Sequence, residues 1–171
     1  TQIMFNDSFN IPYYGTIEHF NTSLVTNMAN TFKDKTSFNY DITLWDTENV
    51  TNMRNMFNNA SSFNQDISGW NISNVTDLSG MFQGASVFDQ AIGSWNTSNV
   101  TNMENMFRGA SVFNQPLSSW NTGNVTNMTG LFASTGAFNQ KLYNWNVINV
   151  TDMTEMFFDT NFNNGTEDNW Y

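Results

Sequence analysis

The sequence predicts a repeat solenoid, in which stacked rungs of 25 residues each contain one short strand and one short helical or 3₁₀ turn. Two observations predict it. A valine followed by threonine recurs every 25 residues, and methionine, phenylalanine and tryptophan recur at fixed distances from that valine. Self-similarity at a period between about 20 and 50 residues indicates stacked units, none of which buries its apolar face alone.

The apolar residues fall into columns that would meet down a single core. The valine column consists of Val25, Val50, Val75, Val100, Val125 and Val150. Two phenylalanine columns follow, at Phe32, Phe57, Phe82, Phe107, Phe132 and Phe157 and at Phe38, Phe63, Phe88, Phe113 and Phe138. The tryptophan column consists of Trp45, Trp70, Trp95, Trp120, Trp145 and Trp170. Methionine at this fixed spacing indicates core filler, not metal handling.

The helical turn is predicted just after each valine. Val75, Leu78 and Phe82 lie at i, i+3 and i+7, which is one face of a short helix or a 3₁₀ turn. Gly84 then supplies a small residue where such a turn must end.

The strand is predicted around the tryptophan. Trp70 and Ile72 are two residues apart, so they point the same way in an extended segment. Stacked in register, each column becomes a continuous apolar ladder. We therefore expect a single solenoid domain over residues 1–171 with about six repeats, of which the terminal rungs at 1–20 and 158–171 are degenerate.

Asparagine is also columnar. Asn74 and its counterparts precede the valine, Asn71 and its counterparts follow the tryptophan, and Asn64 and its counterparts follow the second phenylalanine. Asparagine tolerates left-handed backbone and hydrogen-bonds neighbouring main chain, so these residues are predicted to form the corners of the coil.

Composition excludes two kinds of partner. The net charge is −10 and the five basic residues are scattered along the chain without forming a patch. Nucleic-acid affinity rests mainly on Lys and Arg that neutralise phosphates, and an acidic protein is disfavoured on anionic lipid. No apolar run approaches the ~18 residues of a membrane span. We expect neither a nucleic-acid partner nor membrane insertion.

The sequence contains no recognisable catalytic constellation. His19 is the single histidine, there is no cysteine, and no glycine-rich phosphate loop follows a strand. Carboxylates share a column in no more than two rungs, so no paired acid and base are expected. We expect a protein that is not an enzyme, with no cofactor and no metal site.

The row ISGWNISNVTDLSGMFQGASVFDQ resembles the repeat of bacterial surface lipoproteins and the BspA-like, Treponema-type leucine-rich repeat. Trp70 matches the strand position of that repeat, Val75 and Thr76 its turn, and Phe82 its helical segment, and the resemblance covers residues 17–170. It implies a right-handed, curved solenoid of the leucine-rich-repeat type. It also implies an extracellular or cell-surface protein with a role in cell adhesion.

Two candidate surfaces follow from the repeat. The small polar side chains beside the strand would line the concave face, where the candidates are Asn71, Asn96, Asn121, Asn146 and Tyr143. An aromatic last rung could add a further copy of the chain. The candidates for this end-to-end interface are Met4, Phe5, Phe9, Trp170 and Tyr171.

Two interpretations of the function stay open. The leading one is an extracellular structural component that self-assembles end to end into a filament or sheet, so that its partner is another copy. The alternative is an adhesin-type module that binds a host or matrix protein or a glycan. The bland concave face favours self-assembly, because binding hot spots are enriched in Trp, Tyr and Arg. The family resemblance favours adhesion.

The register predicts different outcomes for substitutions in two columns. Val100→Asp would place an unpaired charge in the core and should unfold the neighbouring rungs. Asn96→Ser, on the predicted concave face, should leave the fold intact. Equal urea midpoints for these two variants would contradict the register.

Overall fold

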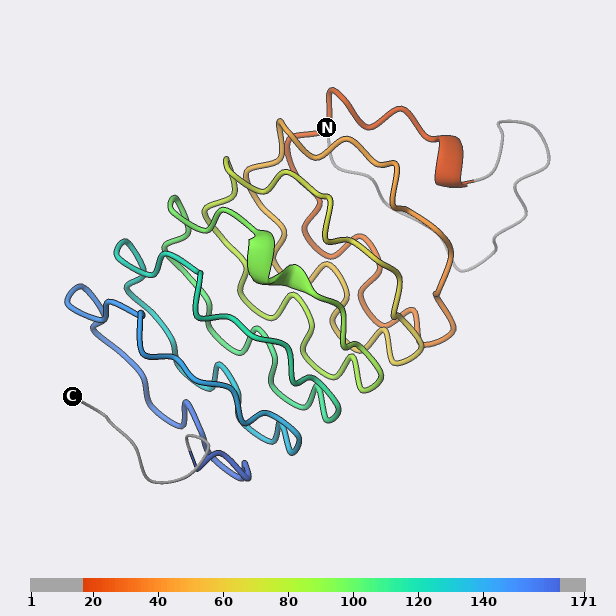
Figure 1. The fold of residues 1–171 in the computed structure, drawn as a ribbon. Helices are drawn as coiled ribbons and strands as arrows, with labels where there is room; N and C mark the ends of the chain where they lie inside the picture. The colour runs from red at the N-terminus through yellow and green to blue at the C-terminus, as the bar shows by residue number, and fades with distance from the viewer. Residues whose placement is uncertain (1–16, 164–171) are drawn as a thin grey trace.

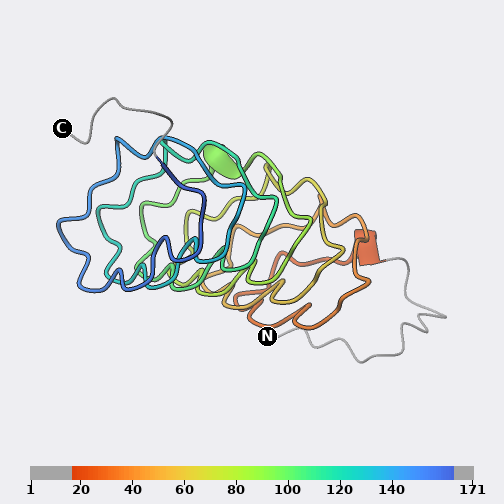
Figure 2. The same ribbon diagram turned by 90° about the horizontal axis from the view of Figure 1, so that it is seen from below.

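The computed structural model describes residues 17–163, which form a coil of stacked rungs (Figures 1 and 2). The rungs follow one another along the stack in chain order, so that residues 25 apart lie side by side. Regular secondary structure is scarce. The described part contains two short 3₁₀ helices, η1 (Ile17–His19) and η2 (Ile92–Ser94), and otherwise consists of turns, isolated bridges and irregular chain. The predicted 25-residue repeat structure is confirmed.

A ladder of backbone hydrogen bonds joins each rung to the next. Isolated parallel bridges pair the residues two positions after the valine, which are Asn27, Asn52, Asp77, Asn102, Asn127 and Asp152. Beyond each bridge, every second N–H donates to the following rung, as Leu78 N does to Asn102 O at 3.0 Å and Gly80 N to Glu104 O at 2.7 Å. The N–H groups between them close turns within their own rung, as Met81 N does to Leu78 O at 3.1 Å. This alternation satisfies the main chain without a helix or a continuous strand.

The predicted helical turn and the predicted strand are therefore wrong. Residues 79–84 form consecutive turns, and residues 67–72 contain no strand. The reason is that Gly80 and Gly84 have φ values of +62° and +69°. A right-handed helix cannot pass through a left-handed residue, whereas a type II turn requires one at its third position.

Left-handed residues recur in every rung and form two columns. The first column contains Asn30, Asn55, Gly80, Asn105, Gly130 and Glu155, and the second contains Asp34, Asn59, Gly84, Gly109, Ser134 and Asp159. These are not the asparagines predicted as corners. The predicted ones do hydrogen-bond main chain, as Asn74 Nδ2 does to Glu48 O at 2.8 Å, but their backbone is not left-handed.

The core consists of stacked aromatic rings. Phe82 and Phe107 are fully buried, and their ring centroids lie 5.7 Å apart in neighbouring rungs. Within one rung, Phe82 also stacks on Phe88 at 3.9 Å. Each tryptophan of the described residues is anchored through its indole N–H, as Trp120 Nε1 donates to Ile92 O of the previous rung at 3.1 Å. Identical residues meet down one core, as the columns predict.

The left-handed glycines make a substitution test possible. Gly130 has φ +59°, and a methyl group there would overlap Asn105 Oδ1. Gly130→Ala should lower the free energy of unfolding by about 2–4 kcal/mol, from left-handed strain and overpacking together. Gly69→Ala is the matched control, because a Cβ at Gly69 meets nothing within 4 Å. Similar losses for both variants in urea unfolding would contradict the backbone geometry.

Candidate functional site

The consecutive turns present one polar surface along the stack, the turn face, formed by residues 29–34 and their counterparts at intervals of 25 residues. Within each rung some side chains of these turns enter the core and others reach the surface. Met81 and Phe82 are fully buried, whereas Gln83 is partly exposed. Because rungs stack in register, outward side chains from several rungs come together on this face.

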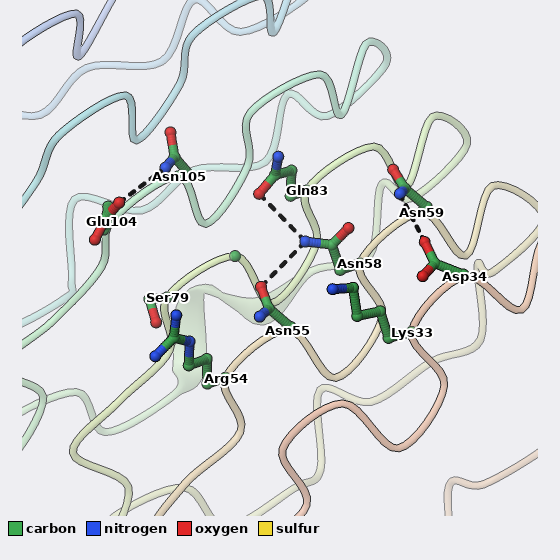
Figure 3. Close-up of a pocket in the computed structure, with 11 residues that line it drawn as sticks. Lys33, Asp34, Arg54, Asn55, Asn58, Asn59, Ser79, Gln83, Glu104 and Asn105 are labelled. Atoms are coloured by element: carbon green, nitrogen blue, oxygen red, sulfur yellow. Dashed lines mark hydrogen bonds between the residues drawn. The ribbon is translucent and has the colours of Figure 1, made fainter. Parts of the chain in front are cut away.

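A groove of about 460 Å³ crosses four neighbouring rungs of the turn face (Figure 3). Its lining contains no apolar side chain. The residues that line it are Lys33, Asp34, Arg54, Asn55, Asn58, Asn59, Ser79, Gly80, Gln83, Glu104 and Asn105.

The carboxylates of the groove are engaged and its cations are not. Asp34 Oδ1 accepts a hydrogen bond from Asn59 Nδ2 at 2.8 Å, and Glu104 Oε1 accepts one from the next side chain at 3.2 Å. Within residues 17–163, neither Lys33 Nζ nor the Arg54 guanidinium has a hydrogen-bond or ion-pair partner. The groove therefore carries two positive charges that no residue between 17 and 163 pairs.

A network of amides fixes the middle of the groove. Asn58 Nδ2 donates to Asn55 Oδ1 at 3.0 Å and to Gln83 Oε1 at 3.2 Å. Both acceptors are thereby occupied, and the Asn55 oxygen also lies over Gly80. The amide nitrogens of Asn55 and Gln83 have no partner among the described residues, so they remain as donors.

Two residues of the lining, Ser79 and Asn105, have a buried side-chain oxygen without a hydrogen-bond partner. Ser79 is 6% exposed, and its unpartnered atom is Oγ. A buried polar group left unsatisfied costs about 1–3 kcal/mol. Its main-chain N–H is satisfied by Asp77 Oδ1 at 2.9 Å, so the cost falls on the hydroxyl alone.

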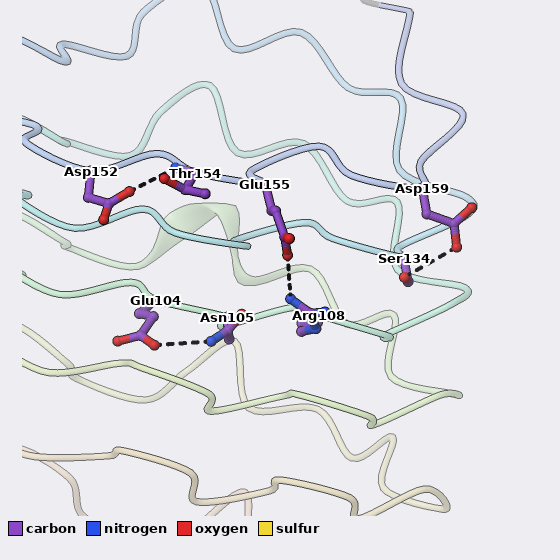
Figure 4. Close-up of polar contacts among 8 residues, drawn as sticks. All are labelled: Glu104, Asn105, Arg108, Ser134, Asp152, Thr154, Glu155 and Asp159. Atoms are coloured by element: carbon purple, nitrogen blue, oxygen red, sulfur yellow. Dashed lines mark hydrogen bonds and ion pairs between the residues drawn. The ribbon is translucent and has the colours of Figure 1, made fainter.

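Beyond the groove the turn face pairs its own charges (Figure 4). Arg108 Nη1 reaches Glu155 Oε2 at 3.2 Å, two rungs further on, and passes over Gly130 on the way. Ser134 Oγ donates to Asp159 Oδ2 at 3.3 Å. This self-pairing distinguishes the later rungs from the groove.

The basic residues are not scattered in space, which corrects the expectation from the sequence. Lys33, Arg54 and Arg108 share the turn face, so three of the five Lys and Arg residues lie on one side. The sequence contains a signal for this, because positions 33 and 108 are three periods apart and belong to one column.

The predicted concave-face asparagines form a column of turn caps. The Oδ1 atoms of Asn71, Asn96, Asn121 and Asn146 each accept the N–H two residues further on, at 3.0–3.2 Å. All four are exposed, as is Tyr143, and none of the five lines the groove. The predicted end-to-end residues, Met4, Phe5, Phe9, Trp170 and Tyr171, lie outside the described residues.

The family model for "Mycoplasma protein of unknown function, DUF285" matches residues 1–104 and, in a second alignment, residues 66–170. The chain belongs to the DUF285 family. Each match spans several rungs, which agrees with a repeat family. No curated protein and no solved structure matches the chain. In the described part of this DUF285 protein, no helix is long and apolar enough to cross a membrane.

We expect the aspartates that cap turns to make the DUF285 protein sensitive to acid. A hydroxyl two residues further on holds the pKa of Asp41 and of Asp66 below the ordinary value, and the main-chain N–H of Thr154 lowers the pKa of Asp152. A lowered pKa stabilises the fold above the ordinary aspartate value near pH ~4, and this contribution is lost as the pH falls through the folded value.

Replacing these three aspartates with asparagine should therefore reduce the loss of stability in acid. Asparagine retains the cap, as Asn102 shows by accepting the Glu104 N–H at 3.0 Å. The triple variant should match the parent in urea unfolding at neutral pH and retain more of its stability near pH ~3. An unchanged acid sensitivity would show that the caps do not contribute.

Proposed function

We propose that this protein is a non-enzymatic extracellular repeat protein that binds a ligand through the groove on the turn face. The observation that carries the proposal is that Lys33 and Arg54 have no partner among the described residues, whereas the carboxylates of the same groove are engaged by amides. Ligand sites are held best by rigid elements, and each groove segment is hydrogen-bonded to a neighbouring rung. On this ground we rank adhesion ahead of self-assembly, which reverses the order that the small polar side chains of the predicted concave face favoured.

The surface location and the right-handed, leucine-rich-repeat-like geometry belong to the same proposal. They rest on the resemblance of the repeat to those of bacterial surface proteins. A partner outside the cell, either a protein or a glycan, fits this setting.

Self-assembly is the second candidate, favoured by apolar side chains on the last described rung. Met153 is 45% exposed, whereas its counterpart one rung earlier, Met128, is fully buried. Ile148 and Phe158 are also exposed on this rung. Another rung stacked there, supplied by a second copy, would cover them.

A binding screen against matrix proteins and glycans tests the proposed function. The Lys33→Gln/Arg54→Gln variant should lose at least about tenfold in affinity for the ligand found, because it removes both unpaired charges. The matched control is Lys35→Gln/Arg108→Gln, which changes the net charge equally and lies outside the groove; it should bind like the parent.

Equal binding by the two double variants would contradict the groove as the site of recognition. Light scattering on the same samples tests the second candidate. Particles that grow with protein concentration, together with no ligand in the screen, would favour the structural role over adhesion.

A further inference from the structure

We infer that the groove recognises an acidic sugar, a hydroxyl-rich ring that carries one carboxylate or sulfate. The inference rests on the proposed function and names the ligand class of the same groove.

The charges of the groove indicate that the ligand carries a negative group. Lys33 and Arg54 both line the groove without a partner among residues 17–163, while Asp34 and Glu104 are engaged by amides. Guanidinium and ammonium groups bind carboxylate and sulfate oxygens through charge-assisted hydrogen bonds, which are about twice as strong as neutral ones. An anionic group of the ligand would thus find its counter-charges already in place.

A single negative group fits better than a polyanion. Figure 3 shows Asp34 and Glu104 toward opposite ends of the groove, with Lys33 and Arg54 between them. A long chain of negative charges would meet both carboxylates, and the chain as a whole carries a net charge of −10. Only a ligand with a localised charge avoids this repulsion.

The other residues of the lining indicate that the ligand contains a hydroxyl-rich ring. Asn55, Asn58 and Gln83 supply amide groups, and no apolar side chain lines the groove. Hydroxyl groups both donate and accept hydrogen bonds, so a sugar can satisfy the amide nitrogens of Asn55 and Gln83. A peptide would find no pocket for an apolar anchor. The volume of about 460 Å³ lies at the small-molecule end of ligand sites.

The direct test is an NMR titration of the full chain with a matched pair of sugars. D-glucuronate and D-glucose differ at C6, where one carries a carboxylate and the other a hydroxymethyl group. Glucuronate should shift the side-chain N–H signals of Arg54, Asn55 and Gln83 and bind at least about tenfold more tightly than glucose. D-glucose 6-sulfate distinguishes sulfate from carboxylate, and blocked aspartate represents an acidic peptide.

Two variants make the test specific. Lys33→Gln/Arg54→Gln should abolish the preference for glucuronate over glucose. Ser79→Ala should leave the preference for glucuronate in place and the urea midpoint unchanged or raised, because its hydroxyl is buried below the groove surface and has no partner. A structural role for Ser79 would instead lower the midpoint.

Equal binding of glucose and glucuronate, or tighter binding of blocked aspartate than of either acidic sugar, would overturn the inference. If the acidic sugars fail but another ligand in the screen still requires Lys33 and Arg54, the proposed function stands and the sugar assignment falls. If no ligand requires these residues, both fall.

Discussion

Every second N–H group of the turn segments donates to a carbonyl of the following rung, and the rest of the structure depends on this ladder. It sets the distance between equivalent residues at 25 positions, so that each phenylalanine meets its counterpart. Burying a phenylalanine side chain contributes roughly 1.5–3 kcal/mol. The aromatic columns therefore supply most of the driving force, while the ladder determines which residues meet.

The ladder also shapes the surface. Since alternate N–H groups point to the next rung, the others must close turns in their own rung, and these turns need left-handed residues. Asn105 illustrates the consequence. Its Oδ1 lies over Gly130 and has no hydrogen-bond partner, because Arg108 occupies the place that Asn58 has two rungs earlier. Arg108 extends instead to Glu155. Substitutions between rungs therefore leave the cations Lys33 and Arg54 without partners among the described residues at one end of the turn face. At the other end, Arg108 is paired with Glu155.

The sequence predicted the columns, the stacking and the number of residues per rung, because period and residue type determine them. It did not predict the turns, since the apolar spacing of Val75, Leu78 and Phe82 is shared by a helix and by these consecutive turns. The missed signal was Gly80, a glycine inside the segment from Val75 to Phe82 that was predicted as helical. The strand was misplaced because the parallel bridge forms at Asp77, beyond the valine.

The groove could not be predicted from the sequence, for a different reason. The period places Lys33 and Arg108 in one column, but it does not bring Arg54 beside Lys33, and it does not show which of these cations has a partner. Pairing depends on side-chain geometry, as the contrast with Arg108 shows, whose carboxylate partner lies 47 residues away in the chain. The same holds for Ser79, which occupies the same column as the exposed Arg54 but is buried in its own rung.

Removing one whole rung tests the register most directly. Deletion of residues 101–125 joins Val100 to Thr126 and restores every column, whereas deletion of residues 101–124 displaces every later column by one position. Urea unfolding followed by tryptophan fluorescence should show cooperative unfolding for the first variant and a markedly lower or absent midpoint for the second. Similar unfolding curves for the two deletions would contradict a structure held together by a 25-residue ladder.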